Sequence, residues 1–242
     1  MRVSDREHWA RIARQWIQWA GRPGHDAFWA YRQTLADYLG PGSGAALDLG
    51  CGEGRVSREL KKLGWRVTAA DVVPAMVEAA RAADSADEYL VAEAGSLPLA
   101  DESFDLVMAY NVLMDVDDLD AVAAEAGRVL KPGGLLFVSL VHPFRDRGHF
   151  AGPEADAAFI LPGTYYGLEY FSEEIEEQGL AMHFAGWSRP LEDYMAALER
   201  AGLAVVSLKE PQPDEAAAPR LAQWSRIPLF LWLKAARYLK PR

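Results

Sequence analysis

Continuous apolar runs alternate along the first part of the chain with segments in which apolar residues recur every three or four positions. The apolar runs predict buried strands at residues 45–49, 65–70, 89–92, 103–109 and 135–141. The segments between them have the spacing of amphipathic helices, because that spacing places apolar side chains on one helical face. Strands that alternate with helices predict an α/β domain with a mostly parallel sheet.

Helical spacing is also present before the first strand, at residues 5–20 and 26–39. This region holds four tryptophans before residue 30. Two roles are open for these helices: a lid that packs over a ligand site at the end of the sheet, or a plain cover for the sheet. Within the strand region, the expected helices are residues 55–63, 72–81 and 119–130.

The first strand runs into a glycine-rich turn, Asp48-Leu49-Gly50-Cys51-Gly52-Glu53-Gly54-Arg55. A strand, a glycine turn and a helix in this order are typical of nucleotide-type cofactor sites, because backbone N–H groups at the helix start face the ligand. The spacing is G-x-G-x-G, which differs from the G-x-G-x-x-G of dinucleotide folds. Asp48 would repel a pyrophosphate and attract a cation. The turn therefore indicates a ligand with an ammonium or sulfonium group.

This turn resembles the first motif of class I S-adenosylmethionine-dependent methyltransferases. Similar segments follow in the family's order: E-A-G-S-L-P-L at 93–99, the strand at 103–109, and R-V-L-K-P-G-G-L-L-F-V at 128–138, in which Lys131–Gly134 is expected to end a helix. The resemblance spans residues 45–142. It implies a doubly wound Rossmann-like fold, S-adenosyl-L-methionine as cofactor and S-adenosyl-L-homocysteine as product.

Several residues are assigned to the cofactor. Asp71 follows the second strand, where a carboxylate can accept from both ribose hydroxyls, although a plain loop aspartate is an alternative. Glu93 and Ala94 fall on the family's adenine-contacting positions, with Glu in place of the family's Asp. Cys51 is expected to pack inside the turn and not to act as a nucleophile. The expected cofactor-binding residues are Asp48, Gly50, Cys51, Gly52, Arg55, Asp71, Val72, Glu93, Ala94, Gly95, Ser96 and Tyr110.

Residues 143–187 lack a helical period and are rich in aromatic side chains. Short strands are expected at 159–161, 165–171 and 180–184, and residues 172–178, S-E-E-I-E-E-Q, are expected to form a solvated turn or helix stub. Ligands of open α/β folds bind beyond the carboxyl ends of the strands. This aromatic insertion after the fifth strand is therefore expected to form a wall for the acceptor substrate.

The last segment predicts a helix at 189–200, two strands at 203–208 and 227–233, and a polar, mobile loop at 211–219. The two strands are expected to be the antiparallel pair that completes a seven-stranded sheet. We interpret residues 1–242 as one domain. Its parts are an N-terminal helical lid (1–40), a cofactor-binding core (45–142), a substrate cap (143–187), and the last helix and strands (188–242).

The composition limits the kinds of molecule that the protein is expected to bind. The formal net charge is −10, which opposes binding to phosphate backbones and favours a small-molecule acceptor over nucleic acid. The single cysteine excludes an internal disulfide, and no early apolar run has signal-peptide or membrane-spanning length, so we expect a cytoplasmic protein with no membrane partner. The five histidines show no metal-ligand spacing, so no metal is expected.

The candidate catalytic residues are expected near strand ends that face the acceptor: His142, Tyr110, Asn111 and Asp115. An in-line displacement needs no dedicated base, because the methyl group already carries a good leaving group. A hydroxyl or ammonium acceptor must lose a proton, and His142 could accept it. A structural histidine is an equal alternative, with Pro143 setting the turn.

The sequence therefore predicts methyl transfer from S-adenosylmethionine to a small, partly aromatic or apolar molecule. Three alternatives remain open: a protein that binds the cofactor without transferring methyl, a dehydrogenase, which the glycine spacing disfavours, and an enzyme that uses the sulfonium charge for another reaction. The pattern leaves open the acceptor, the methylated atom, the use of a base and the oligomeric state.

Overall fold

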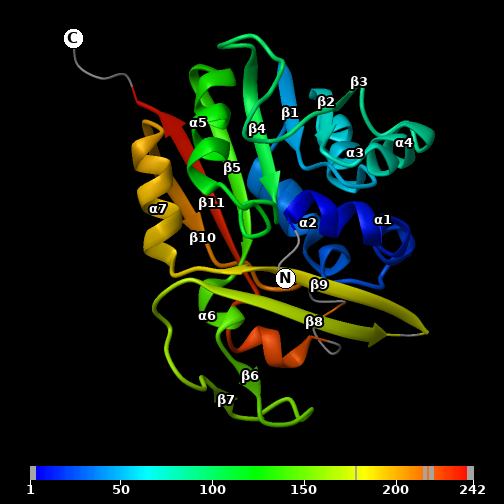
Figure 1. The fold of residues 1–242 in the computed structure, drawn as a ribbon, viewed down its shortest axis with the longest axis vertical. Coiled ribbons are helices and arrows are strands. Elements are labelled where there is room, and N and C mark those ends of the chain that lie inside the picture. The colour runs from blue at the N-terminus through cyan, green and yellow to red at the C-terminus, as the bar shows by residue number, and fades with distance from the viewer. Residues whose placement is uncertain (1–3, 178, 215–216, 218–220, 239–242) are drawn as a thin grey trace.

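The computed structural model describes residues 4–177, 179–214, 217 and 221–238, and it contains a seven-stranded sheet with helices on both faces (Figure 1). The strand order is β10-β11-β5-β4-β1-β2-β3. Strands β1 to β5 are parallel, and β11 is antiparallel to both β5 and β10. The strands are β1 (Ala45–Leu49), β2 (Arg66–Asp71), β3 (Glu88–Val91), β4 (Phe104–Tyr110), β5 (Leu130–Val141), β10 (Leu203–Lys209) and β11 (Phe230–Arg237).

Helices cover the two faces of the sheet unequally. One apolar core joins the sheet to α5 and α7, and a second joins it to α2, α3 and α4. These helices are α2 (Phe28–Leu39), α3 (Arg55–Lys62), α4 (Pro74–Ala82), α5 (Leu119–Val129) and α7 (Leu191–Arg200). All five residues of β1 are buried, as expected for a central parallel strand covered on both sides. The structure confirms the doubly wound, mostly parallel fold that the sequence predicts.

The order in which strands are added to the sheet reverses between β1 and β4. These two strands lie side by side although β2 and β3 separate them in the chain. In open α/β sheets this reversal leaves a crevice beyond the carboxyl ends of the two strands, where ligands bind. The glycine turn follows β1 and Tyr110 ends β4. The fold therefore brings both to one edge of the sheet.

The boundary between α5 and β5 differs from the expected one. Lys131–Gly134 was predicted to end the helix as a turn, but β5 already begins at Leu130, which lies opposite Phe104. The register shifts between Phe104 and Leu106, and Gly133 has a φ of 81°. The first residues of β5 are thus irregular, because Gly133 takes a left-handed conformation inside the strand that glycine adopts readily.

The segment after β5 forms α6 (Pro143–Asp146), a small pair β6 (His149–Phe150) and β7 (Phe159–Ile160), and a long hairpin of β8 (Glu169–Glu177) and β9 (Leu180–Ser188). The prediction of a strand at 165–171 followed by a turn at 172–178 is wrong. Residues 169–177 pair with β9 along their full length, and Gln178 lies outside the described residues. The acidic run hides a period of two, in which Ile175 opposes the fully buried Met182 and glutamates occupy an exposed edge.

The last part of the chain follows the expected order of α7, β10 and β11, with a short 3₁₀ helix at Ala222–Ser225. Within the predicted mobile loop 211–219, residues 215, 216, 218 and 219 lie outside the described part. Asp214 is tied to α2, since its N–H donates to the Ala30 carbonyl at 2.7 Å and its carboxylate accepts from the Thr34 hydroxyl at 2.8 Å.

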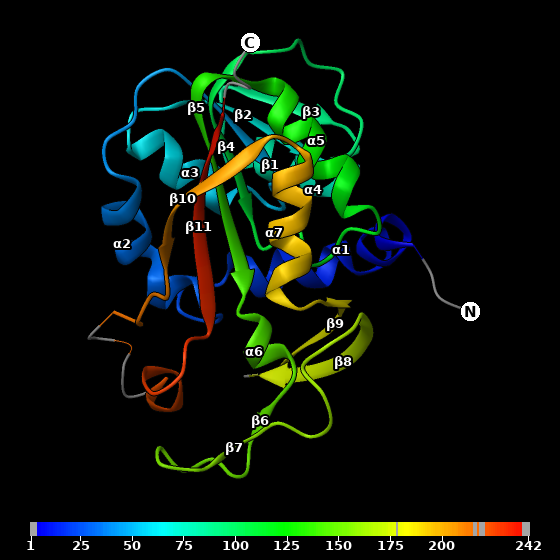
Figure 2. The same ribbon diagram turned by 90° about the vertical axis from the view of Figure 1, so that its left-hand side faces the viewer.

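Helix α1 (Asp5–Gly21) crosses the carboxyl ends of the strands, between α4 and the β8–β9 hairpin (Figure 2). It begins with a capping box, in which the Ser4 hydroxyl accepts from the Glu7 N–H and the Glu7 carboxylate accepts from the Ser4 N–H. Ile12 and Trp19 pack against Met182 of β9, whereas Ala13 packs against Met76 of α4. Helix α1 therefore lies over the ligand edge of the sheet.

Candidate active site

The glycine turn after β1 has the tight geometry that its sequence predicts. Gly50, Gly52 and Gly54 have φ values of 71°, 54° and 88°, a region that side chains rarely occupy. The N–H groups of Gly50 and Cys51 both donate to the Ala70 carbonyl of β2, at 2.8 and 2.9 Å. The turn is thereby fixed between β1 and β2, and it leads directly into α3.

Asp71 at the end of β2 holds this turn from the other side. One carboxylate oxygen accepts from the Gly52 N–H and the other from the Val73 N–H, both at 2.9 Å. Burial raises the pKa of Asp71, and the two backbone donors oppose that rise. Each carboxylate oxygen has a second lone pair, so Asp71 can accept further hydrogen bonds from a ligand hydroxyl.

Asp48 and Cys51 lie beneath the turn and contribute to its interior. Asp48 is 1% exposed, and the Ser57 hydroxyl donates to its carboxylate at 2.5 Å. Burial raises the pKa of Asp48 to about 7, although the bond from Ser57 lowers it. Burial also raises the pKa of the Cys51 thiol, which is consistent with a packing role.

Arg55 connects the turn to the N-terminal helices. Its guanidinium forms an ion pair with Asp26 and lies over the rings of Trp16 and Phe28, at 4.9 and 4.6 Å from their centroids. The side chain is buried, and the neighbouring carboxylates raise its pKa against the effect of burial. Arg55 therefore joins α1 and α2 to the start of α3, and its assignment to the cofactor stays a prediction.

The 93–96 segment forms a tight turn after β3. The Ser96 N–H donates to the Glu93 carbonyl at 3.0 Å, and the Glu93 carboxylate accepts from Arg6 of α1 at 2.9 Å. The side chains of Arg6 and Glu93 are both exposed. Ala94 packs against the main core, and Gly95 lies between Ala94 and Ser96 in the turn. Glu93, which is predicted to contact adenine, is thus paired with Arg6 of α1.

The end of β4 carries a strained residue at the ligand edge. Asn111 is not a glycine but has a φ of 56°, and the Ser139 hydroxyl donates to its side-chain oxygen at 2.7 Å. Residues held in this left-handed region cluster at functional sites. Tyr110, 7% exposed, lies against Phe28, and burial raises the pKa of its hydroxyl. At the end of β4, Tyr110 therefore packs against Phe28, whereas Asn111 takes a left-handed conformation.

His142 follows β5 and caps α6. Its Nδ1 accepts from the Phe144 N–H at 3.1 Å, and its Nε2 lies 3.1 Å from a carboxylate oxygen of Glu210. A ring that accepts at Nδ1 carries its proton at Nε2, where that proton is donated to Glu210. Burial lowers the pKa of His142 and Glu210 opposes the change. Both nitrogens are engaged, which matches the structural alternative for this histidine.

Asp115 lies in the loop after β4, under the hairpin. An atom at the Cβ position of Gly186 would lie 2.8 Å from its carboxylate, so β9 approaches it at a distance that only glycine allows. Burial and the nearby Asp146 raise its pKa well above the ordinary value. Asp146 and the buried Tyr194 belong to the same group of side chains, and the sequence analysis missed both. Their signal was weak, since only the position of Asp146 after the fifth strand pointed to this edge.

Helix α1 covers the glycine turn from outside. An atom at the Cβ position of Gly52 would lie 3.0 Å from the indole nitrogen of Trp16, and no other side chain of the described residues lies within 4 Å of that position. Trp16 and Ala13 also belong to the apolar cluster that includes the predicted cofactor residue Val72. Of the two roles considered for α1, its position over the turn fits a lid.

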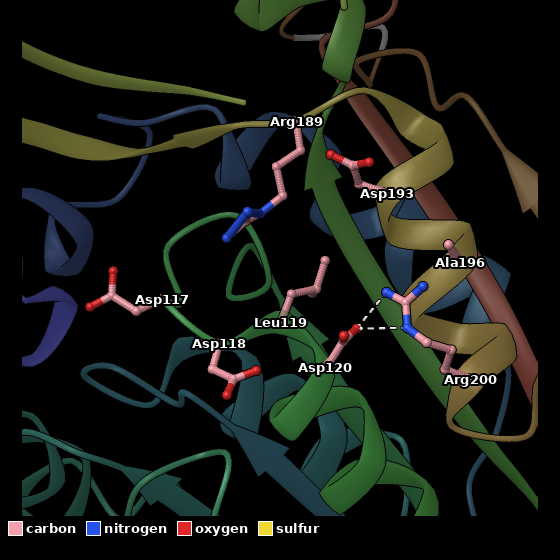
Figure 3. Close-up of a pocket in the computed structure, with 8 residues that line it drawn as sticks. All are labelled: Asp117, Asp118, Leu119, Asp120, Arg189, Asp193, Ala196 and Arg200. Atoms are coloured by element: carbon pink, nitrogen blue, oxygen red, sulfur yellow. Dashed lines mark hydrogen bonds and ion pairs between the residues drawn. The ribbon is translucent and has the colours of Figure 1, made fainter. Parts of the chain in front are cut away.

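A separate cleft of about 460 Å³ lies between α5 and α7 (Figure 3). Asp120 and Arg200 form an ion pair of 2.6 Å across it, and Arg189 enters from the start of α7. The cleft is polar and does not include the glycine turn or Asp71. Sequence reasoning gave no indication of it.

Comparison with known proteins agrees with this geometry. A family described as "Methyltransferase domain" matches residues 47–138. A solved S-adenosylmethionine-dependent methyltransferase from Mesorhizobium loti is 26% identical with a TM-score of 0.67, over 88% of this chain and 98% of that one. Residues 47–138 therefore form a methyltransferase domain, the fold is that of class I S-adenosylmethionine-dependent methyltransferases, and the cofactor of such domains is S-adenosylmethionine.

Two curated relatives are more specific. A malonyl-[acyl-carrier protein] O-methyltransferase from Serratia marcescens is 37% identical over 48% of this chain, and the match spans 47% of that relative's length. A ubiquinone biosynthesis O-methyltransferase from Xanthomonas axonopodis is 28% identical over 81% of this chain and 84% of its own length. The chain thus spans about half the length of the first relative. None of the described helices is both long and apolar enough to cross a bilayer.

Proposed function

We propose that this protein transfers a methyl group from S-adenosylmethionine to a small-molecule acceptor. The observation that carries the proposal is the attachment of Asp71 to the Gly52 N–H at the edge where β1 and β4 meet. This contact places a carboxylate beside Gly52, whose Cβ position lies next to the Trp16 indole. The similarity to methyltransferases named for quinone and malonyl-carrier substrates supports a small acceptor.

The residues present fit the cofactor. Asp71 would hold the ribose hydroxyls, the turn 50–54 the amino-acid portion, and the 93–96 segment the adenine ring. Asp48 adds a negative charge beneath the turn, which favours a cationic ligand. When bound, S-adenosylmethionine supplies a methyl group on a positively charged sulfur.

The protein's own contribution to the reaction is positioning and the exclusion of water. Holding the acceptor atom in line with the methyl group could supply about 7 to 11 kcal/mol of the acceleration, as in favourable intramolecular reactions. Trp16 and α1 would exclude water from the turn, and the hairpin above Asp115 would form the acceptor wall together with the rest of residues 143–187. Tyr110 and Asn111 would border the reacting groups.

Proton removal from the acceptor is a smaller part of the proposal. His142 would have to give up its bond to the Phe144 N–H or to Glu210 before it could accept a proton. The Asp115 carboxylate has no hydrogen-bond partner among the described residues, and a raised pKa increases the basicity of a carboxylate. We therefore favour Asp115 over His142 for any acceptor that must lose a proton.

Calorimetry with S-adenosylhomocysteine tests the proposal. Asp71→Ala should weaken binding by about 1 to 3 kcal/mol, because charged hydrogen bonds to the ligand are lost. Glu78→Gln is the matched control, since Glu78 is an exposed carboxylate on α4 whose ion pair among the described residues is with Arg81. Equal affinity of the Asp71→Ala variant and the wild type would refute the ribose assignment, and no binding by the wild type would refute the proposed function.

A further inference from the structure

We propose that Asp26 is a positioning residue for cofactor binding: its ion pair with Arg55 holds Trp16 of α1 over the glycine turn and slows release of the bound cofactor. This inference rests on the proposed function and goes beyond it by naming the contact that controls the lid. Asp26 lies in residues 22–27, the connection between α1 and α2, whereas Arg55 begins α3 directly after the turn. The pair therefore connects the lid to the turn that it covers.

Asp26 uses its two carboxylate oxygens for two different helices. One oxygen accepts from the Phe28 N–H at 3.0 Å, at the start of α2, and the other forms the ion pair with the Arg55 guanidinium. The side chain of Asp26 is 13% exposed and that of Arg55 is 8% exposed, so salt and water screen this pair little. The pair therefore fixes the starts of α2 and α3 relative to each other.

The Arg55 guanidinium also lies over two aromatic rings, 4.9 Å from the centroid of Trp16 and 4.6 Å from that of Phe28. An aromatic face attracts a cation, and the attraction is stronger when water is excluded. An atom at the Cβ position of Gly52 would in turn lie 3.0 Å from the Trp16 indole nitrogen. The position of Arg55 therefore determines how closely this indole covers the turn.

The connection between α1 and α2 is attached to α1 by a second contact. The His25 ring packs edge-on against the Trp19 ring, with 4.3 Å between their centroids, and both side chains are buried. Trp19 itself packs against Met182 of β9. A displacement of Asp26 would therefore reach α1 along two routes, through the adjacent His25 and through the ring that covers Arg55.

The ion pair should set the balance between a covered and an uncovered turn. A ligand beneath a lid leaves when the lid opens, so weaker lid contacts speed its release. Hydrogen bonds between charged groups correspond to about tenfold or more in such an equilibrium. Burial lowers the pKa of Arg55, whereas Asp26 and Glu53 raise it. Glu53 would therefore still compensate the buried guanidinium if Asp26 lost its charge.

The test measures the dissociation of S-adenosylhomocysteine from the immobilised full chain by surface plasmon resonance. Asp26→Asn keeps an acceptor for the Phe28 N–H but removes the charge, so the ligand should dissociate about tenfold faster. Asp105→Asn is the matched control, because Asp105 also accepts from a backbone N–H, that of Ala45, and pairs with Lys131. It lies where β1 begins, at the opposite end of that strand from the turn, and should leave the rate unchanged.

A double-mutant comparison separates positioning from a purely structural role. Trp16→Leu should also speed dissociation, and Asp26→Asn added to it should change the rate by less than about twofold, because both substitutions remove one contact. In the ligand-free protein, Asp26→Asn should speed amide exchange in residues 5–21 and leave β10 unchanged. If Asp26→Asn does not fold, Phe28→Leu provides the same measurements, since it keeps the ion pair and removes one ring.

Three results would contradict the inference. Unchanged dissociation from Asp26→Asn, with S-adenosylhomocysteine still bound by the wild type, would overturn it alone, and a lower urea midpoint in that variant would then assign the pair to fold stability. Multiplying effects of the Asp26 and Trp16 substitutions would show that Asp26 does not act through Trp16. Failure of S-adenosylhomocysteine to bind the wild type would overturn the proposed function and, with it, this role of Asp26.

Discussion

Asp48 has a buried charge whose cost depends on pH. Burial raises its pKa to about 7 in the folded protein, against an ordinary value near 4 in the unfolded chain. Below about pH 4 both states are protonated and the cost is absent, whereas above about pH 7 the folded protein holds a buried charge. The free energy of unfolding should therefore fall as the pH rises between these values.

Asp48→Asn should remove this pH dependence. The stability of the variant relative to the wild type should increase by on the order of 4 kcal/mol from pH 4 to pH 8, since one pKa unit corresponds to about 1.4 kcal/mol. Urea denaturation at several pH values measures the difference, and Glu78→Gln serves as the exposed control. Parallel stability curves for Asp48→Asn and the wild type would show that Asp48 does not carry the effect.

His142 should behave as a helix cap in mutational tests. His142→Ala should lose about 0.5 to 2 kcal/mol of stability, because the Phe144 N–H loses its acceptor, and His142→Asn should recover much of it. Its pKa is lowered by burial, so its contribution is present at neutral pH and is lost as the pH falls through its folded pKa.

The same variants report on catalysis once an acceptor is known. A positioning role predicts a loss of turnover near tenfold or less, with the pH profile unchanged and Asn restoring activity. A general base would instead cost about 10² to 10⁴-fold in both variants and remove a limb of the pH profile. That second outcome would reinstate His142 as the proton acceptor.

For single residues, the sequence predicted position along a strand better than it predicted which distant residues lie together in the fold. The positions of the glycines, Asp71 and Asn111 at strand ends were predicted because each follows a recognisable strand. The electrostatic effect of Asp146 on Asp115 was not predicted, because Asp146 belongs to α6, which follows the next strand, and no spacing in the sequence relates the two. The partners of His142 were missed for the same reason, since Glu210 lies 68 positions away.

At the scale of elements, α1 provides a direct test of the lid. Binding of S-adenosylhomocysteine should change amide exchange in residues 5–21, because Trp16 lies on Gly52 and must adjust to a ligand at the turn. Residues 203–209 of the edge strand β10 are the internal control, since they lie across the sheet from the turn. If amide exchange in α1 is unchanged at saturating ligand, α1 only covers the sheet and does not act as a lid.

Element boundaries were predicted well where the pattern was regular and poorly where two signals competed. The helices and central strands lie within a few residues of their predicted bounds. In β8 the dense glutamates masked an alternation that pairs Ile175 with Met182, so charge was taken as evidence for a turn. At 131–134 the Pro-Gly-Gly sequence was taken as a stop, although the strand had already begun.

At the scale of the whole molecule, net charge predicts weak interaction with polyanions. With a formal net charge of −10, the protein should pass through a heparin column in buffer of about 0.15 M salt. A basic nucleic-acid-binding protein of similar size, loaded together with it, should be retained. Retention of this protein, lost on adding salt, would reveal a basic surface that the overall charge conceals.

The overall fold was predictable because its first five strands form a repeating unit with one strong local signal in each segment. The antiparallel pairing of the last two strands was also predicted. The cap was less predictable, since its hairpin packs against α1 and its contacts connect segments far apart in the chain. Such contacts depend on the assembled fold and leave little trace in local periodicity.

Helix α1 touches both sides of the site, with α4 and the glycine turn on one side and the β8–β9 hairpin on the other. A ligand bound at the glycine turn that fixes the position of α1 also changes the surface that α1 presents to the β8–β9 hairpin. The effect of the cofactor on acceptor affinity must then equal the effect of the acceptor on cofactor affinity. We therefore expect a compulsory order of addition in which the cofactor enters first and its demethylated product leaves last. In steady-state kinetics, S-adenosylhomocysteine should then compete with S-adenosylmethionine but not with the acceptor.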